Sequence, residues 1–344
     1  MQWISFPDDR VSVCGLPWFA EDAPSVRRLP TRMKDRIRPP VWNLAQMPAG
    51  GRLRFRTDTT ALEIRATYPN SAAHGNMSLI GQSGVCVYVD GYHWVSQAPG
   101  PISDRNAGVF ERKLYSGASK RMRDVTLYLP NYNAVDVDVI GIDDDAFIEP
   151  SGHFAISRPI VFYGSSITQG GCASRSGMSY EAILGRILDV DFVNLGFSGN
   201  GLGDPELAEA MAEIDAACYV LDYAVNLKEV DDLRGNYTAF IETIRAKRPD
   251  TPIVAITPIF ATHERWSAEA RSKWNGFRDV IRAEVGLLVS NGDPIRLIEG
   301  YSLFGPDIAD GMADAVHPND VGFTAMATRL APTIADVVGL GIER

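Results

Sequence analysis

Hydrophobic and polar residues alternate in short runs through the first 150 residues of the chain. Apolar side chains occupy every second position in five runs, at 52–56, 61–66, 85–90, 123–129 and 135–142. A period of two places one face of a strand on a core and the other in water. Turn residues separate the runs, and no helical period is sustained. The pattern predicts a β-sandwich or jelly-roll domain over residues 1–152.

The pattern changes near residue 150, where apolar strands begin to alternate with amphipathic helices. Strands are predicted at about 159–163, 191–195, 217–223, 252–257 and 295–298. Helices are predicted at about 177–188, 205–213, 229–247, 266–284 and 320–337. Asp204 before Pro205, and Asn319 or Asp320 after Pro318, suit helix starts. This alternation indicates parallel βαβ units, so we expect an α/β domain over residues 153–344.

Composition narrows the class of protein. The chain has 344 residues, of which 45% are apolar and 22% charged, as in soluble globular proteins. A net charge of −10 argues against a nucleic-acid partner, which would need a basic face. No run approaches the roughly 20 apolar residues of a membrane span. The amino terminus lacks the features of a secretion signal, so we expect a cytoplasmic protein.

Two smaller features have structural interpretations. The four cysteines lack C-x-x-C spacing, which favours free buried thiols over disulfides or a zinc site; they are Cys14, Cys86, Cys172 and Cys218. Cys172 lies close to the candidate nucleophile described below; packing is the favoured role, and lining the site is the alternative. A basic stretch at 27–38 carries six positive charges and one Asp. It indicates a solvated or interdomain surface, with an anion site as the alternative.

The candidate chemistry begins at the end of the first predicted parallel strand, where Gly164 is followed by Ser165 and Ser166. A surface turn would suit the same residues, and a serine needs a base to act as a nucleophile. His317 is the best candidate base, because Asp314, three residues earlier, can accept from its Nδ1–H and fix the tautomer. The alternative for this pair is a helix cap.

Two other predicted strand ends offer donors for a developing oxyanion. The backbone N–H of Gly199 follows the second parallel strand, and the side-chain amide of Asn226 follows the third. Each is a common turn residue by itself. Their occurrence in one topological series with Ser166, Asp314 and His317 favours a serine-nucleophile site.

These residues resemble the four blocks of the SGNH (GDSL-like) hydrolases. Gly164-Ser165-Ser166-Ile167-Thr168 corresponds to the first block, which makes Ser166 the nucleophile. Gly199 matches the second-block glycine, Asn226 the third-block asparagine, and Asp314-Ala-Val-His317 the last block. Segments near Arg28-Leu-Pro, 40–44 and 124–130 resemble a subgroup with an amino-terminal β-sandwich.

The resemblance implies a three-layer αβα, flavodoxin-like catalytic domain that uses no metal or cofactor. It also implies an oxyanion hole formed by the N–H groups of Ser166 and Gly199 and the side chain of Asn226. Three features depart from the family pattern: Ser165 replaces the usual Asp, the third block lacks its Gly, and Leu227 replaces the Asp that follows the asparagine. The two third-block departures weaken the assignment of Asn226.

Further residues and functions stay open at this point. Tyr163, Arg175 and His263 are candidate substrate contacts, while Trp266 and Trp274 are expected to pack in the core. The glycines at 199–203 do not fit a dinucleotide-binding motif. The leading function is a serine esterase acting on small acyl or carbohydrate-borne esters. The alternatives are an acyltransferase with the same site and an inactive sugar-binding protein; the oligomeric state is not predicted.

Overall fold

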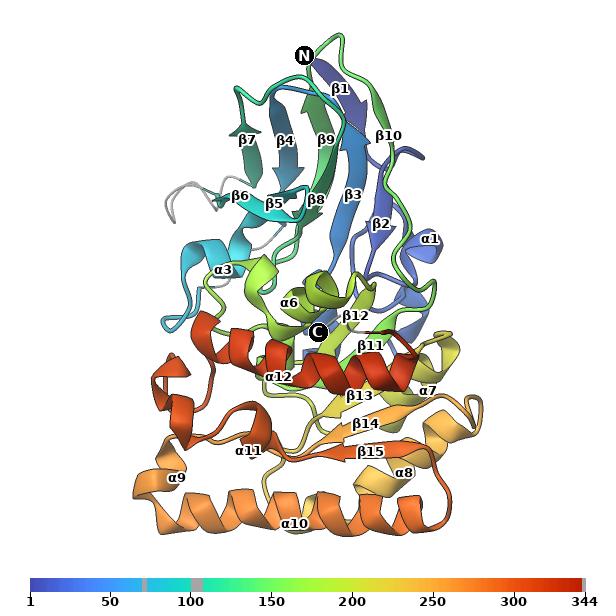
Figure 1. The fold of residues 1–344 in the computed structure, drawn as a ribbon, viewed down its shortest axis with the longest axis vertical. Coiled ribbons are helices and arrows are strands. Elements are labelled where there is room, and N and C mark those ends of the chain that lie inside the picture. Colours follow the sequence, from blue (N-terminus) through green and yellow to red (C-terminus); the bar gives the residue numbers. More distant parts are fainter. Residues whose placement is uncertain (70–72, 100–107, 342–344) are drawn as a thin grey trace.

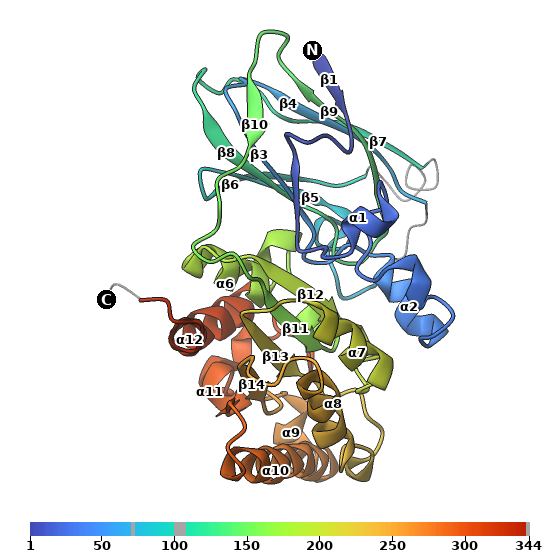
Figure 2. The ribbon, with the colours of Figure 1, turned by 90° about the vertical axis from the view of Figure 1, so that its right-hand side faces the viewer.

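The computed structural model describes residues 1–69, 73–99 and 108–341. It has an all-β part that precedes an α/β part, and the two pack end to end (Figure 1 and Figure 2). The last strand of the first part ends at Pro150, and the first strand of the second begins at Ile160. We propose the predicted division at residue 152 as the boundary between them.

The amino-terminal part consists of two antiparallel sheets packed around one core. One sheet has the order β1-β9-β4-β7 and the other β10-β3-β8-β5-β6, with β2 paired to β3. The strands are β1 Gln2–Ser5, β2 Ser12–Cys14, β3 Arg52–Thr57, β4 Leu62–Thr67, β5 Val85–Val89, β6 Tyr92–Gln97, β7 Val109–Tyr115, β8 Arg123–Tyr128, β9 Asp136–Ile142 and β10 Ile148–Pro150. Leu53, Phe55 and Ile64 are fully buried between the sheets, as their alternation predicts.

The five alternating runs correspond to β3, β4, β5, β8 and β9. The other five strands were not predicted, and they lie at sheet ends or, for β2, beside the main path. An edge strand is partly solvated, so it need not carry a regular apolar face. Short helical segments also interrupt this part: α1 Phe19–Asp22, η1 Thr31–Met33, α2 Pro39–Ala45 and α3 Leu79–Ser83.

The carboxyl-terminal part is a five-stranded parallel sheet between two helical layers, as predicted. Its order β12-β11-β13-β14-β15 is that of a flavodoxin-like fold. The strands are β11 Ile160–Gly164, β12 Phe192–Gly196, β13 Cys218–Asp222, β14 Ile253–Ile256 and β15 Ile295–Ile298. The helices are α5 Ser166–Gln169, η2 Ser176–Met178, α6 Tyr180–Leu188, α7 Pro205–Glu213, η3 Val230–Asp232, α8 Asn236–Arg245, α9 His263–Trp266, α10 Ala268–Ser290, α11 Gly300–Leu303, η4 Pro306–Gly311 and α12 Asp320–Val338.

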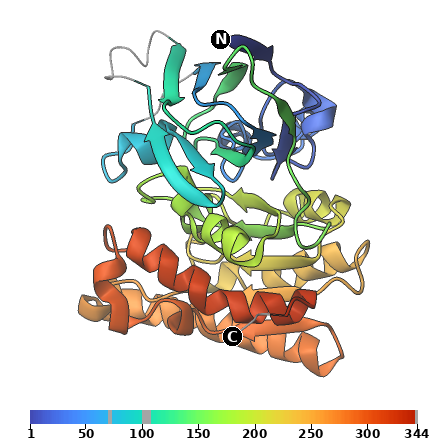
Figure 3. The same ribbon diagram turned by 45° about the horizontal axis from the view of Figure 1, so that its top comes forward.

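Strands β11 to β14 are buried on both faces, whereas the edge strand β15 is only partly buried. Phe162 of β11 packs toward α6 and α12, whereas Tyr163 packs on the opposite face with α7, α8 and α10. Figure 3 shows α12 crossing the front of the α/β part below the β part. Strands covered on both sides have continuous apolar sequences, which is why the sequence located them within one or two residues.

Two helix predictions need correction. The helix expected at 229–247 begins only at Asn236, because Gly235 adopts a positive φ of 70° that interrupts a helix. The expected core residue Trp266 is 86% exposed at the end of α9, so its predicted packing role is wrong. Trp274 is partly buried, and its ring lies edge-on to His263 at 4.6 Å between centroids.

The basic stretch at 27–38 forms part of the interface between the two parts of the chain. Arg28 is almost completely buried and donates to four backbone carbonyls, those of Leu44, Met47, Asn194 and Gly196. Arg38 forms a two-pronged ion pair with Asp204, the residue before α7. The interdomain prediction is therefore confirmed, and Asp204 binds Arg38 with its carboxylate instead of capping α7.

The four cysteines are free, and three of them are buried, whereas Cys172 is partly exposed. Within the described ranges, no helix has both the length and the apolar character needed to cross a membrane.

Candidate active site

The loop after β11 places Ser166 at the carboxyl edge of the parallel sheet. β11 ends at Gly164, where a side chain would meet the Thr168 hydroxyl at 2.0 Å, so this position requires glycine. Ser165 then caps α5 by accepting a hydrogen bond from the N–H of Ile167 at 3.2 Å. Ser166 is the first residue of α5 and is 7% exposed. The strand therefore delivers the serine to the sheet edge where ligands bind in open α/β folds.

His317 lies within hydrogen-bond distance of this serine, although 151 residues separate them in sequence. The distance between Ser166 Oγ and His317 Nε2 is 2.8 Å, and that between His317 Nδ1 and Asp314 Oδ2 is 2.9 Å. The structure thus brings the three predicted residues together in a continuous Ser–His–Asp arrangement. With the Nδ1 hydrogen directed to the carboxylate, Nε2 is free to accept the serine proton.

Asp314 is held by four hydrogen bonds. The N–H groups of Val316 and His317 donate to Oδ1, both at 2.8 Å, while the His317 ring and the Asn76 side chain, at 2.9 Å, approach Oδ2. Burial by itself raises the pKa of Asp314, but these hydrogen bonds outweigh it and lower the pKa well below its ordinary value. The carboxylate therefore stays ionised and can stabilise a protonated His317.

The β part contributes two contacts that the sequence did not reveal. Asn76, which precedes α3, is the side chain that donates to Asp314. Tyr132 donates its hydroxyl to the backbone carbonyl of Ser166 at 3.2 Å. Gly171 lies between Tyr132 and His317, because a side chain there would be 2.8 Å from the Tyr132 hydroxyl and 3.3 Å from His317. No local motif marks Asn76 or Tyr132, since each acts through tertiary contact.

The three predicted oxyanion donors lie at the carboxyl ends of neighbouring strands. Ser166 N–H is in the first turn of α5, where helix N–H groups have no intrahelical acceptor. Gly199, after β12, is exposed and has a positive φ of 66°, with no neighbouring heavy atom where a Cβ would lie. Asn226, after β13, accepts from Gly201 N–H through Oδ1 at 3.2 Å, which leaves its NH₂ group as a donor.

Sequence comparison assigns most of the chain to known families. Residues 157–335 match the model of the GDSL-like lipase/acylhydrolase family. The chain belongs to this family. Residues 1–148 match a second model, described as the N-terminus of SGNH-hydrolase-type esterases. The predicted SGNH ester hydrolase with an amino-terminal β domain is therefore confirmed. No curated protein matches the sequence.

Solved structures share the whole architecture. A protein described as a GDSL-like lipase from Bacteroides ovatus is 27% identical, with a TM-score of 0.89 over 100% of this chain and 99% of its own. The salicylyl-acyltransferase SsfX3 of a tetracycline biosynthetic pathway is 19% identical, with a TM-score of 0.82 over 98% and 97%. A family two carbohydrate esterase from Clostridium thermocellum, in complex with cellohexaose, is 17% identical, with a TM-score of 0.65 over 85% and 93%. At 19% and 17% identity, the similarities to the acyltransferase and to the carbohydrate esterase establish a shared fold alone.

Two of the departures from the family pattern, Ser165 and Leu227, have structural explanations. Serine and aspartate are both good helix caps, so Ser165 holds the start of α5 as an aspartate would. Leu227 is 8% exposed and packs in the core beneath the sheet, where a carboxylate would be costly to bury. Neither replacement removes a group from the Ser166–His317–Asp314 arrangement.

The family member's three predicted substrate contacts have different surroundings. Tyr163 is fully buried, and its hydroxyl accepts from the N–H of Gly203 at 2.9 Å, so it belongs to the core and cannot touch a substrate. Arg175 is partly buried, and its nearest carboxylate is Asp320 at 3.9 Å. His263 lies against the loop that carries Asp314, with Nδ1 at 3.3 Å from the Ala315 carbonyl.

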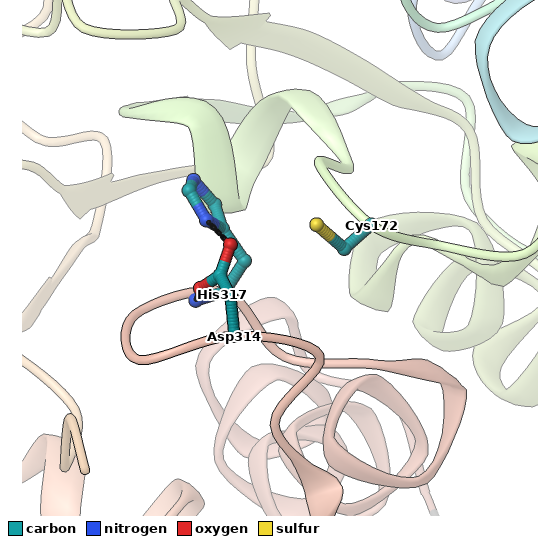
Figure 4. Close-up of side chains that lie close together, drawn as sticks. All are labelled: Cys172, Asp314 and His317. Carbon is teal, nitrogen blue, oxygen red and sulfur yellow. Dashed lines mark hydrogen bonds and ion pairs between the residues drawn. The ribbon is translucent and has the colours of Figure 1, made fainter. Parts of the chain in front are cut away.

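Cys172 lies beside Asp314 and His317, in line with the alternative role that its position near the candidate nucleophile suggested. It follows α5 with a positive φ of 70°, which is uncommon for a residue with a side chain. Figure 4 shows its sulfur on the side facing Asp314 and His317. Burial and, to a smaller extent, the charge of Asp314 raise the pKa of the thiol to about 12, so it is neutral at ordinary pH. The favoured packing role is incomplete, because the residue also lines the site.

Proposed function

We propose that this family member is a serine carboxylesterase that works through an acyl-enzyme on Ser166. The observation that carries the proposal is the 2.8 Å contact between Ser166 Oγ and His317 Nε2, on a histidine oriented by Asp314. A serine becomes a useful nucleophile only with a base in such reach. In this arrangement the nucleophile, the base and the group that orients the base are all present.

In the acylation step, Ser166 Oγ attacks the carbonyl carbon of the ester while its proton passes to His317 Nε2. The imidazolium that forms is stabilised by Asp314, whose lowered pKa keeps it ionised. The carbonyl oxygen becomes an oxyanion, for which we propose Ser166 N–H, Gly199 N–H and the Asn226 amide as donors. Collapse of the tetrahedral intermediate breaks the ester bond, and His317 protonates the departing alcohol.

In the second step, His317 acts again as a base and takes a proton from water. The resulting hydroxide attacks the acyl carbonyl on Ser166, and the proton returns to Ser166 Oγ as the acid leaves. The start of α5 and the hydrogen bond from Tyr132 position the backbone of Ser166 for both steps. Every proton transfer uses the same Nε2 atom.

For the substrate class, we propose small acyl esters, with acetyl groups carried on carbohydrates as the leading case. The similarity in fold to the cellohexaose-bound carbohydrate esterase and to a second family two carbohydrate esterase from Cellvibrio japonicus supports this choice. The fold shared with the salicylyl-acyltransferase supports the alternative of acyl transfer to an alcohol. Both reactions pass through the same acyl-enzyme and differ in which acceptor reaches it.

The first test is hydrolysis of p-nitrophenyl esters from acetate to octanoate. Ser166→Ala should lower kcat by at least about 10³-fold, since it removes the nucleophile. Ser165→Ala is the matched control: it removes a neighbouring hydroxyl and one helix cap, at a cost of about 1 kcal/mol in stability, but leaves the nucleophile in place. Equal activity in the wild type and Ser166→Ala would refute the proposed nucleophile.

Acceptor competition separates the two reactions. With an acetylated sugar as donor, an esterase releases acetate at the rate at which the sugar is deacylated. An acyltransferase releases less acetate and forms a new ester when an alcohol is added. A folded wild type that binds a sugar but turns over no ester would instead support the inactive, sugar-binding alternative.

A further inference from the structure

The fold brings a third metal-ligating side chain to the histidine and the aspartate of the triad. One ligand atom each from Cys172, Asp314 and His317 lie within 4.8 Å of one another. The cysteine comes from the loop after α5, and the other two come from the loop before α12 (Figure 4). The three residues therefore form no metal-binding motif that could be recognised in the sequence. The proposed ester reaction makes no use of the thiol.

We infer that Cys172, Asp314 and His317 form a site for a thiophilic divalent cation, represented by Zn²⁺ or Cd²⁺, and that its occupation inhibits the enzyme. Thiolate and imidazole ligands favour such metals over Mg²⁺ and Ca²⁺, which prefer oxygen ligands. Three protein ligands leave a fourth position for water. This cation is an inhibitor and takes no part in the ester reaction.

The geometry needs only a small adjustment to bind the ion. Zinc bond lengths of about 2.0–2.3 Å place the ligand atoms of a tetrahedral site roughly 3.3–3.8 Å apart. The longest separation, up to 4.8 Å, therefore closes by about 1 Å, while the 2.9 Å between His317 Nδ1 and Asp314 Oδ2 opens by roughly 0.4 Å when the ion binds Nδ1. Side-chain rotation of Cys172 and His317 can supply both changes. The side chains of His317 and Asp314 are 20% and 32% exposed, so an ion can reach them from solvent.

Binding at either ring nitrogen of His317 removes the catalytic base. A cation at Nε2 occupies the lone pair that would accept the Ser166 proton. A cation at Nδ1 displaces the hydrogen from that nitrogen and replaces the contact with Asp314, and the neutral ring then carries its hydrogen on Nε2. The thiol proton of Cys172 is released to solvent in both cases. Inhibition therefore requires no movement of the backbone.

The test compares the wild type with Cys172→Ala, which keeps a Cβ at this positive φ and removes only the sulfur. Ester hydrolysis is measured while Zn²⁺ is added and then removed with a chelator. We expect reversible inhibition of the wild type, and at least about a tenfold higher Zn²⁺ concentration for half-inhibition of Cys172→Ala. The inhibition of each protein is expressed relative to its own activity without metal, and Mg²⁺ should inhibit neither.

A second readout does not depend on esterase activity. Titration with Cd²⁺ should give the ultraviolet charge-transfer absorbance of a cadmium–thiolate bond in the wild type and in Ser166→Ala, but not in Cys172→Ala. The other three cysteines are buried, so they do not contribute in the folded protein. If the proposed esterase function fails, this titration still tests the metal site.

Two results would overturn the inference. Equal Zn²⁺ inhibition of the wild type and Cys172→Ala would place the ion on the triad without the thiol. Absence of the cadmium–thiolate absorbance in the wild type would show that the three side chains do not converge on an ion.

Discussion

Asp222 should make the free energy of unfolding depend on pH, because this carboxyl group is buried at the end of a central strand. It is the last residue of β13, beside Gly164 of the nucleophile strand. Its carboxylate accepts hydrogen bonds from the Tyr180 hydroxyl at 3.1 Å and from the Thr168 hydroxyl at 3.4 Å. Burial raises the pKa of Asp222 from 3.8 to about 6, against the smaller opposing effect of these hydrogen bonds. The folded state therefore favours the protonated acid.

The magnitude follows from the two pKa values. A difference of about two units corresponds to a destabilisation of roughly 3 kcal/mol at pH 8, where the acid is ionised in both states. Because the folded protein binds the proton more tightly, this penalty is relieved as the pH falls through 6, and it is fully relieved below 3.8. Between pH 8 and pH 5, the expected relief is about 1.4 kcal/mol.

Asp222→Asn tests this reasoning, because asparagine is neutral at every pH and still offers an oxygen to Tyr180 and Thr168. The free energy of unfolding would be measured by urea denaturation of the wild type and the variant between pH 8 and pH 5. We expect the variant to be the more stable at pH 8, by up to about 3 kcal/mol, and its advantage to shrink by about 1.4 kcal/mol at pH 5. Asp250→Asn removes an exposed carboxylate and serves as the matched control. An advantage of Asp222→Asn that stays constant with pH would refute the reasoning.

Three other substitutions test contacts described above. Arg28→Met should reduce the free energy of unfolding by at least about 3 kcal/mol in urea denaturation, because it removes the donor to four backbone carbonyls, and two of these four hydrogen bonds are buried; an effect as small as that of Arg27→Met would contradict this. Asn76→Ala should lower kcat about three- to tenfold in the ester assay with little change in KM or stability, since it removes one of four hydrogen bonds to the proposed triad carboxylate. An unchanged kcat would mean that the backbone donors suffice. Gly171→Ala should lower kcat at least about tenfold, because its Cβ would displace neighbours of His317. Gly286→Ala, in open space on α10, should leave kcat unchanged, and equal kcat values in the two alanine variants would contradict the prediction.

The buried strands could be predicted because burial on both faces gives each of them a recognisable local sequence. β11 to β14 are covered by helices on both faces, so each is a short apolar run bounded by turn residues. The start of α12 could also be predicted from neighbouring residues alone, because Asn319 caps the helix as expected. Edge strands such as β6 and β7 lack this signature because solvent contacts part of their surface.

The proposed triad was predictable for a different reason. Each half of the proposed triad is a short motif that can be recognised in the sequence: Gly164 with Ser166, and Asp314 with His317. Each motif needs the other for a serine mechanism, which suggested that the two meet in the fold. Asn76 belongs to no such motif: it is an exposed asparagine in a loop, and its importance depends on a contact 238 residues away. Tyr163 illustrates the reverse error, because closeness to Ser166 in sequence does not give closeness to the site when alternate strand residues face opposite sides.

The contacts between the two parts of the chain argue that the β part supports the proposed catalytic loops directly. Asn76 holds Asp314, and Tyr132 holds the backbone of Ser166. Gln169, at the end of α5, donates to the carbonyl of Asn131, while Arg28 binds carbonyls at the end of β12. A fragment that begins near residue 152 would lose all four contacts and would expose buried polar groups around the nucleophile. Loss of esterase activity in such a fragment would therefore report on the positioning of the triad as well as on any contact between the β part and a substrate.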